Sequence, residues 1–116
     1  WYIKNKDYSM YHAGDTGYSK DFTDTRLKLG APKYAFIPIG AYDPEWFMAE
    51  SHVNPEDAVQ IMLDLEADKA FGMHWATFTL TDEDTIEPKE RLKKAVNENG
   101  SIDFESVSPG DVIYLK

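Results

Sequence analysis

The sequence predicts an α/β fold in which a mixed β-sheet carries helices on at least one face. Three observations lead to this prediction: an apolar run at Tyr34–Ile39, a helix-start signal at Asn54–Asp57, and a second apolar run at Lys69–Trp75. Because the second run follows the helix after only a short link, strand, helix and strand form a crossover unit, whose two strands lie parallel. The 116 residues are expected to form a single domain, 1–116, because a chain of this length is too short for two.

The N-terminal part predicts a hairpin followed by a short helix. Trp1–Lys4 and Tyr8–Ala13 are rich in β-forming residues, and the polar Asn5–Asp7 between them predicts a tight turn. Asp21–Leu29 predicts a helix, and Gly30 is suited to its left-handed C-terminal cap. Three apolar side chains of this helix are expected on one weak stripe: Phe22, Leu27 and Leu29.

The middle of the chain predicts the crossover unit. Tyr34–Ile39 is apolar on both faces, as in an interior strand, and Pro38 predicts an irregular end to it. Asn54 is suited to a helix N-cap and Pro55 to the first helical position. The apolar residues that continue this helix are Ala58, Val59, Ile61, Met62 and Leu65. The strand Lys69–Trp75 follows after a short link, so it should lie parallel to the earlier one.

The C-terminal part predicts one more helix and one more strand. Pro88–Asn97 has the spacing of an amphipathic helix, and Asn99–Gly100 should end it. Its two inward side chains are expected to be Leu92 and Val96. Ser108–Asp111 predicts a turn into a last strand, Val112–Leu115.

Composition excludes several classes of partner and ligand. The net charge of −9 makes attraction to a nucleic-acid backbone unfavourable, so no nucleic acid is expected as a partner. Because the chain has no cysteine, any metal must be held by His, Asp or Glu. The sequence shows no signal peptide and no apolar run of about 18 residues, which fits a cytoplasmic protein that does not span a membrane.

Three loops at predicted strand or helix ends each hold a potential metal ligand or substrate contact: Asp15, His52 and His74. Asp15 stands between glycines, where a carboxylate is free to reach a metal, although a turn aspartate that bonds its own backbone has the same pattern. His74 ends an apolar strand and is suited to bind zinc or to be a buried core residue. His52 precedes a helix N-cap, where it would meet an anionic substrate or be a polar loop residue. His12 is expected to be structural.

Two further clusters of side chains can be interpreted as structural or as functional. The aromatic residues around Tyr42 and Trp46 would line the bottom of a substrate pocket or form ordinary packing surface. The acidic run Asp82–Asp84 is expected to be a solvated loop, because it lacks the glycine and the spaced oxygens of a calcium loop.

Four segments together resemble a known family in both order and spacing: Tyr11–Tyr18, Ile37–Met48, His52–Val59 and Met73–Phe78. They are similar to the C-terminal half of N-acyl-phosphatidylethanolamine phospholipase D-like hydrolases of the metallo-β-lactamase fold. The resemblance covers nearly the whole chain. It implies half of an αβ/βα sandwich, a mixed β-sheet with helices on one face, in a protein that binds two zinc ions, or similar metals, at one edge.

The resemblance also implies roles for five residues. Asp15 matches the position that bridges the two metals, and His74 matches a terminal ligand of the second metal. His52 matches a catalytic-site position that contacts substrate, and Tyr42 and Trp46 match a loop that shapes the substrate pocket. The reaction implied is hydrolysis of a phosphodiester or a related ester, with a small-molecule or lipid-like substrate.

The family's His-x-His-x-Asp-His motif and one further histidine ligand are absent from this sequence. Because catalytic zinc needs several protein ligands, the chain alone is expected to be inactive and to need an N-terminal half. Two alternatives remain: a non-catalytic oligomeric interaction module derived from the fold, and a split enzyme whose other half is a separate chain. The apolar strands predict that a second copy, in a homodimer, or the missing half covers the sheet.

Overall fold

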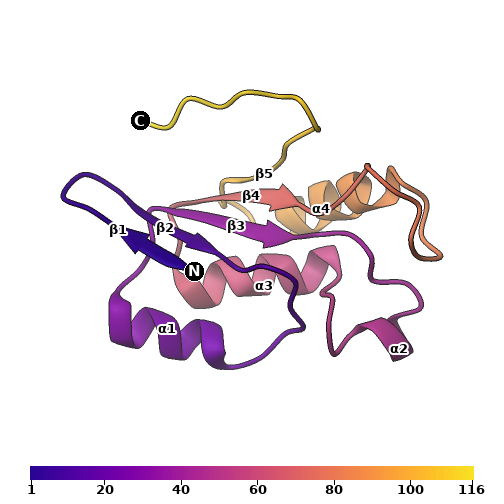
Figure 1. Cartoon of the computed structure of the whole chain (residues 1–116), viewed down its shortest axis with the longest axis horizontal. Helices are drawn as coiled ribbons and strands as arrows, with labels where there is room; N and C mark the ends of the chain where they lie inside the picture. The colour runs from indigo at the N-terminus through magenta and orange to yellow at the C-terminus, as the bar shows by residue number, and fades with distance from the viewer.

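A five-stranded mixed sheet organises the fold, and the computed structural model describes all residues 1–116 (Figure 1). The strands lie in chain order and are β1 (Tyr2–Lys4), β2 (Ser9–His12), β3 (Tyr34–Pro38), β4 (Lys69–Met73) and β5 (Phe104–Ser106). β1 pairs with β2 antiparallel, and every later pair is parallel. The predicted hairpin and the α/β class with a mixed sheet are therefore confirmed.

The helices are α1 (Asp21–Leu29), α2 (Glu45–Met48), α3 (Pro55–Leu65) and α4 (Glu87–Glu98). Side chains of α1, α3 and α4 share one buried cluster with β3, β4 and β5, so these three helices cover the same face of the sheet. Figure 1 shows α1 and α3 on one side of the sheet and the C-terminal segment on the other. None of the four helices has both the length and the apolar character that crossing a membrane requires.

The strand–helix–strand unit at the centre forms as predicted. Asn54 caps α3 with its side-chain oxygen, which accepts a hydrogen bond from the amide of Asp57 at 2.8 Å. Pro55 occupies the first helical turn, where its missing N–H leaves no bond unmade. β3 and β4 then pair parallel, with Phe36 opposite Phe71. Alternation along β3 sends Ala35 and Ile37 into the core beneath α3, while Phe36 between them faces the other side.

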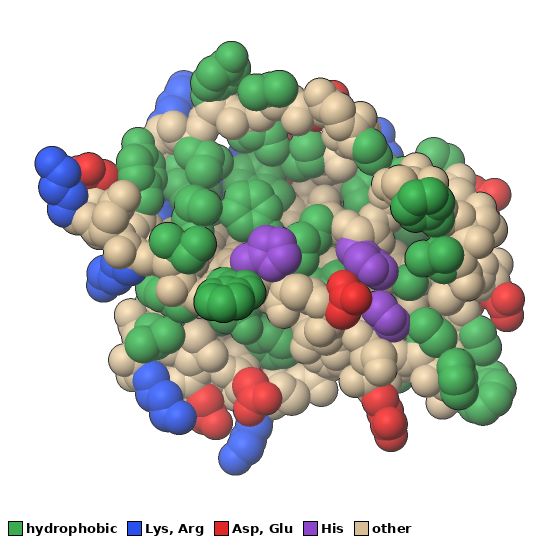
Figure 2. All heavy atoms as spheres, viewed as in Figure 1, with side chains coloured by type: hydrophobic (Ala, Val, Ile, Leu, Met, Phe, Trp, Pro, Cys, Tyr) green, Lys and Arg blue, Asp and Glu red, His purple; other side chains and the backbone are tan.

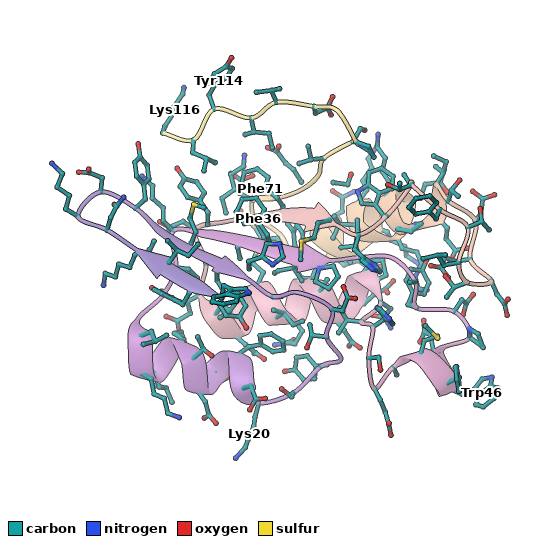
Figure 3. The ribbon with its side chains drawn as sticks, in the orientation of Figure 1. Lys20, Phe36, Trp46, Phe71, Tyr114 and Lys116 are labelled. Carbon is teal, nitrogen blue, oxygen red and sulfur yellow. The ribbon has the colours of Figure 1, made fainter.

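That other face of the sheet is aromatic and lies under the C-terminal segment. Phe36 and Phe71 stack with ring centroids 5.4 Å apart, and Figure 3 shows both between the sheet and the segment that carries Tyr114 and Lys116. The Tyr34 hydroxyl donates to the backbone oxygen of Lys116 at 2.5 Å, which anchors this segment. A cavity of about 440 Å³ remains between the segment and the sheet.

The predicted last strand, Val112–Leu115, is wrong. This segment pairs with no strand, and the fifth strand is Phe104–Ser106. The reason is burial: Phe104 is 6% exposed and belongs to the core, whereas Val112 is 75% exposed. A β-forming composition predicts a strand only where a neighbouring edge is free to pair with it.

Two smaller expectations also need correction. α1 has the predicted bounds, but only Phe22 is buried, while Leu27 and Leu29 are 70% and 49% exposed. β4 ends at Met73, earlier than predicted, because His74 has a φ of 61°, which no strand residue adopts. The short helix α2 was not predicted.

Candidate metal centre

Three of the predicted site residues meet at one edge of the sheet. Asp15 follows β2, His52 precedes α3 and His74 follows β4, and their ligand atoms all lie within 4.8 Å of one another. The Nε2 atom of His74 is 3.4 Å from a carboxylate oxygen of Asp15. The two imidazole rings stack with centroids 5.3 Å apart. Figure 2 shows two histidine side chains beside an acidic side chain on the visible face.

Parallel strands explain why residues so distant in sequence converge. β2, β3 and β4 run in the same direction, so the loops that follow them emerge at the same edge. The segment before α3 joins them because the amide of Val53 donates to the backbone oxygen of Thr16 at 3.0 Å. Gly17 permits this approach, since a Cβ there would lie 2.5 Å from the backbone oxygen of Glu50. Asp15 and His52 are thereby held on adjacent loops.

His74 occupies a tightly constrained turn. Its φ of 61° lies in the left-handed region, which is uncommon for a residue other than glycine. On one side, a Cβ on Gly40 would lie 2.4 Å from the backbone oxygen of His74, so the loop after β3 rests against this turn. On the other side, the indole nitrogen of Trp75 donates to the backbone oxygen of Val107 at 3.1 Å. Neighbours on both sides therefore hold the backbone of this turn in place.

The donor set and its surroundings fit a divalent metal. Two imidazoles and a carboxylate are the ligand types that zinc and similar metals accept. The Nδ1 atom of His52 is buried and has no hydrogen-bond partner in the chain, a condition that costs free energy unless a ligand satisfies the atom. His12, in contrast, is outside the cluster, and its Nδ1 accepts a bond from the amide of Gly14 at 3.2 Å.

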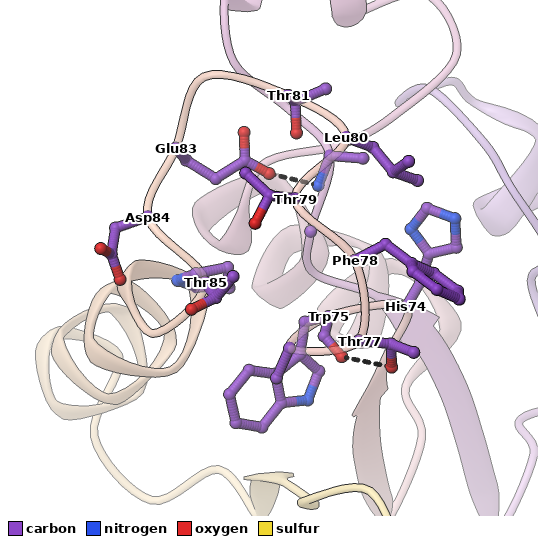
Figure 4. Close-up of a pocket in the computed structure, with 14 residues that line it drawn as sticks. His74, Trp75, Thr77, Phe78, Thr79, Leu80, Thr81, Glu83, Asp84 and Thr85 are labelled. Atoms are coloured by element: carbon purple, nitrogen blue, oxygen red, sulfur yellow. Dashed lines mark hydrogen bonds between the residues drawn. The ribbon is translucent and has the colours of Figure 1, made fainter.

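A cavity of about 340 Å³ opens beside His74, between the loop after β3 and the segment from Trp75 to Thr85 (Figure 4). No lysine or arginine lines it. Its lining includes four hydroxyl side chains: Thr77, Thr79, Thr81 and Thr85. Phe78 and Leu80 add apolar surface at its rim, where they are 74% and 71% exposed.

Tyr42 and Trp46, the two predicted pocket residues, do not line this cavity. Tyr42 is fully buried, its hydroxyl donates to Glu87 at 2.7 Å, and the guanidinium of Arg91 lies 4.6 Å from its ring centroid. Burial and the bond to Glu87 raise the pKa of Tyr42 well above its ordinary value. Trp46 is 86% exposed and, as Figure 3 shows, points away from the body of the molecule. Their part in a substrate pocket stays a prediction.

Glu83 was expected in a solvated loop, and that expectation is wrong. Its side chain is buried, with the residue 8% exposed, and it accepts hydrogen bonds from the loop after β3. Its acidic neighbours Asp82 and Asp84 are exposed, as expected. Nothing in a run of three acids marks the middle one as buried, because its partners are backbone amides about 40 residues earlier in the chain.

Comparison with known proteins shows which families and structures this chain is similar to. A family described as "Beta-lactamase superfamily domain" matches residues 1–75. The chain is 46% identical, over 72% of its length, to the mitochondrial N-acyl-phosphatidylethanolamine-hydrolyzing phospholipase D of Saccharomyces cerevisiae. It is 34% identical, over 97% of its length, to N-acyl-phosphatidylethanolamine-hydrolyzing phospholipase D 1 of Caenorhabditis elegans. The chain spans only 18% and 33% of these two relatives.

A solved structure shows the same fold. It is Igni18, a metallo hydrolase from the archaeon Ignicoccus hospitalis, which superimposes with a TM-score of 0.67 at 26% sequence identity. The match covers 97% of this chain and 43% of Igni18. The sheet and helices described above therefore correspond to rather less than half of a larger metallo-hydrolase fold.

Proposed function

Because the chain belongs to the β-lactamase superfamily, in its N-acyl-phosphatidylethanolamine phospholipase D-like branch, we propose that it is the C-terminal half of a zinc-dependent hydrolase of phosphodiesters or related esters. The convergence of Asp15, His52 and His74 carries this proposal. These residues come from three separate loops, and their ligand atoms all lie within 4.8 Å of one another, close enough for Asp15 and His74 to hold a metal ion beside His52.

Each of the three residues has a proposed task. Asp15 and His74 hold the metal, since they already approach to 3.4 Å and both face the edge of the sheet. His52 contacts the substrate and donates a hydrogen bond to an anionic oxygen of the ester, for which its buried, unpartnered Nδ1 is available. The chemistry that a bound zinc ion supplies there is Lewis-acid polarisation of the ester.

We further propose that this chain alone is inactive. Catalytic zinc sites use about three protein ligands for each ion and leave one position open, so a two-metal site needs more ligands than this cluster offers. The additional ligands would come from outside these 116 residues, in agreement with the much greater length of the relatives. A cytoplasmic location stays a prediction, because the name of the yeast relative describes that protein as mitochondrial.

Zinc titration by isothermal calorimetry tests the proposed site. We expect weak zinc binding by the chain, lost in Asp15→Asn and in His74→Gln. The matched control is His12→Gln, which removes an exposed histidine outside the cluster and should leave zinc binding unchanged. Equal binding by all four proteins would refute the site. Tight stoichiometric binding with turnover of a generic phosphodiester would refute the proposed incompleteness.

A non-catalytic interaction module is a second candidate, and one observation favours it. Large apolar side chains are exposed at the surface; they include Trp46, Phe47, Phe78 and Leu80, at 86%, 69%, 74% and 71%. Apolar exposure of this kind is typical of surfaces that meet a partner. An interaction module has no need of a metal, so the zinc titration also distinguishes the two candidates.

A further inference from the structure

The carboxylate of Glu83 binds three consecutive backbone amides of the loop after β3. It accepts hydrogen bonds from Ala41 at 2.5 Å, from Tyr42 at 3.3 Å and from Asp43 at 3.1 Å. Figure 4 shows the Glu83 side chain turned toward this loop, across the cavity wall. The residue is only 8% exposed, so water cannot readily replace these bonds. The Glu83 carboxylate therefore accepts hydrogen bonds from N–H groups of this loop that would otherwise be buried and unpaired.

The contact between the two segments is reciprocal. While Glu83 accepts from the loop, the amide of Asp82 donates to the backbone oxygen of Asp43 at 3.1 Å. Burial raises the pKa of Glu83, but hydrogen bonds from Thr81 and from backbone amides outweigh that effect, so its pKa lies below the ordinary value. Glu83 is thus ionised at neutral pH, the form that accepts hydrogen bonds best.

The loop that Glu83 holds is the one that rests against His74. Gly40 lies so close that a Cβ on it would come within 2.4 Å of the backbone oxygen of His74. Both Ala41, with φ of 64°, and His74, with φ of 61°, have left-handed backbone conformations. Such conformations persist only where surrounding contacts enforce them. The hydrogen bonds of Glu83 supply those contacts on the Ala41 side.

We propose that Glu83 is a positioning residue of the metal centre: by fixing Gly40–Asp43, it supports the turn at His74 and directs the imidazole toward Asp15. This proposal rests on the proposed metal role of His74. Glu83 touches neither the imidazole nor the carboxylate of Asp15, and so it acts only through the backbone between them. Removing it leaves the ligands present but misplaced.

Two substitutions test the proposal, and a third controls for stability. Glu83→Gln keeps the shape of the side chain but replaces one accepting oxygen with an NH₂ group that faces a backbone amide donor. Glu83→Ala removes all three hydrogen bonds to the loop. Leu65→Val is the control, because it weakens the core at the far end of α3, away from the metal centre. In ¹H–¹⁵N NMR spectra without metal, we expect both Glu83 variants to shift the Ala41 and Asp43 amide signals and the His74 imidazole signals. Zinc affinity should fall about tenfold, as for other residues that orient metal ligands.

The outcomes separate this proposal from the proposed function. Unmoved His74 signals in both Glu83 variants would overturn it, and so would an equal shift in Leu65→Val, which would make the effect a general loss of stability. If the unmodified chain binds no zinc, the proposed function fails, yet the His74 signals still decide whether Glu83 positions the imidazole. Glu83→Gln keeps the test decisive if Glu83→Ala does not fold.

Discussion

His52 combines a buried, unpartnered nitrogen with a position beside two potential metal ligands. A buried polar atom without a partner opposes folding by about 1 to 3 kcal/mol. Its ring also stacks on that of His74, with centroids 5.3 Å apart. The residue is therefore better explained by a ligand than by the stability of the chain alone.

We expect His52→Leu to stabilise the metal-free chain, because it removes the unpartnered nitrogen while keeping an apolar contact with His74. The free energy of unfolding in urea should rise by about 1 kcal/mol. A fall of that size would contradict the argument and show that Nδ1 has a partner in solution.

Glu83 should also shape the acid sensitivity of the fold. Its pKa is below the ordinary value of 4.5 in the folded chain, so its contribution to stability is fully present above that pH and is lost as the pH falls through the folded pKa. In Glu83→Gln this loss should vanish. Urea unfolding between about pH 7 and about pH 3 measures the difference, and parallel pH profiles for the two proteins would contradict it.

Among the elements, α3 begins where it does because of hydrogen bonding and backbone preferences local to its first turn. The side-chain oxygen of Asn54 accepts from the amide of Asp57, and Pro55 stands in the first turn. Asn54→Ala should lower the free energy of unfolding by about 1 kcal/mol. Asn54→Asp, which keeps the accepting oxygen, is the control and should cost less. A change within error for Asn54→Ala in a urea melt would mean that the cap contributes nothing.

At the scale of the whole molecule, the aromatic face of the sheet is the surface through which we expect association. We predict that the chain associates as a symmetric dimer, since burial of apolar surface contributes about 25 cal/mol per Å² and a two-fold pair buries the same face on both copies. The segment Val107–Lys116 already covers part of this face and opposes association. Sedimentation equilibrium at micromolar concentration measures the mass. A monomer near 13.3 kDa would show that the segment covers the sheet sufficiently.

Local patterns alone determined most of the elements. The N-cap of α3 and the apolar runs of β3 and β4 lie in residues adjacent in sequence, where steric and hydrogen-bonding preferences act directly. The three ligand candidates were also identifiable, because each stands at the end of a predicted element or in a loop beside one. The parallel arrangement followed from the order strand, helix, strand, with only a short link between α3 and β4.

Tertiary structure alone decided the rest. Phe104–Ser106 became the fifth strand because Phe104 joins the core beside β4, while the more β-like Val112–Leu115 lies over the aromatic face of the sheet and pairs with no strand. Glu83 became a buried anion because three amides about 40 residues away needed an acceptor. Such outcomes depend on which groups remain unpaired once the other elements have packed, and that information is not carried by neighbouring residues in the sequence.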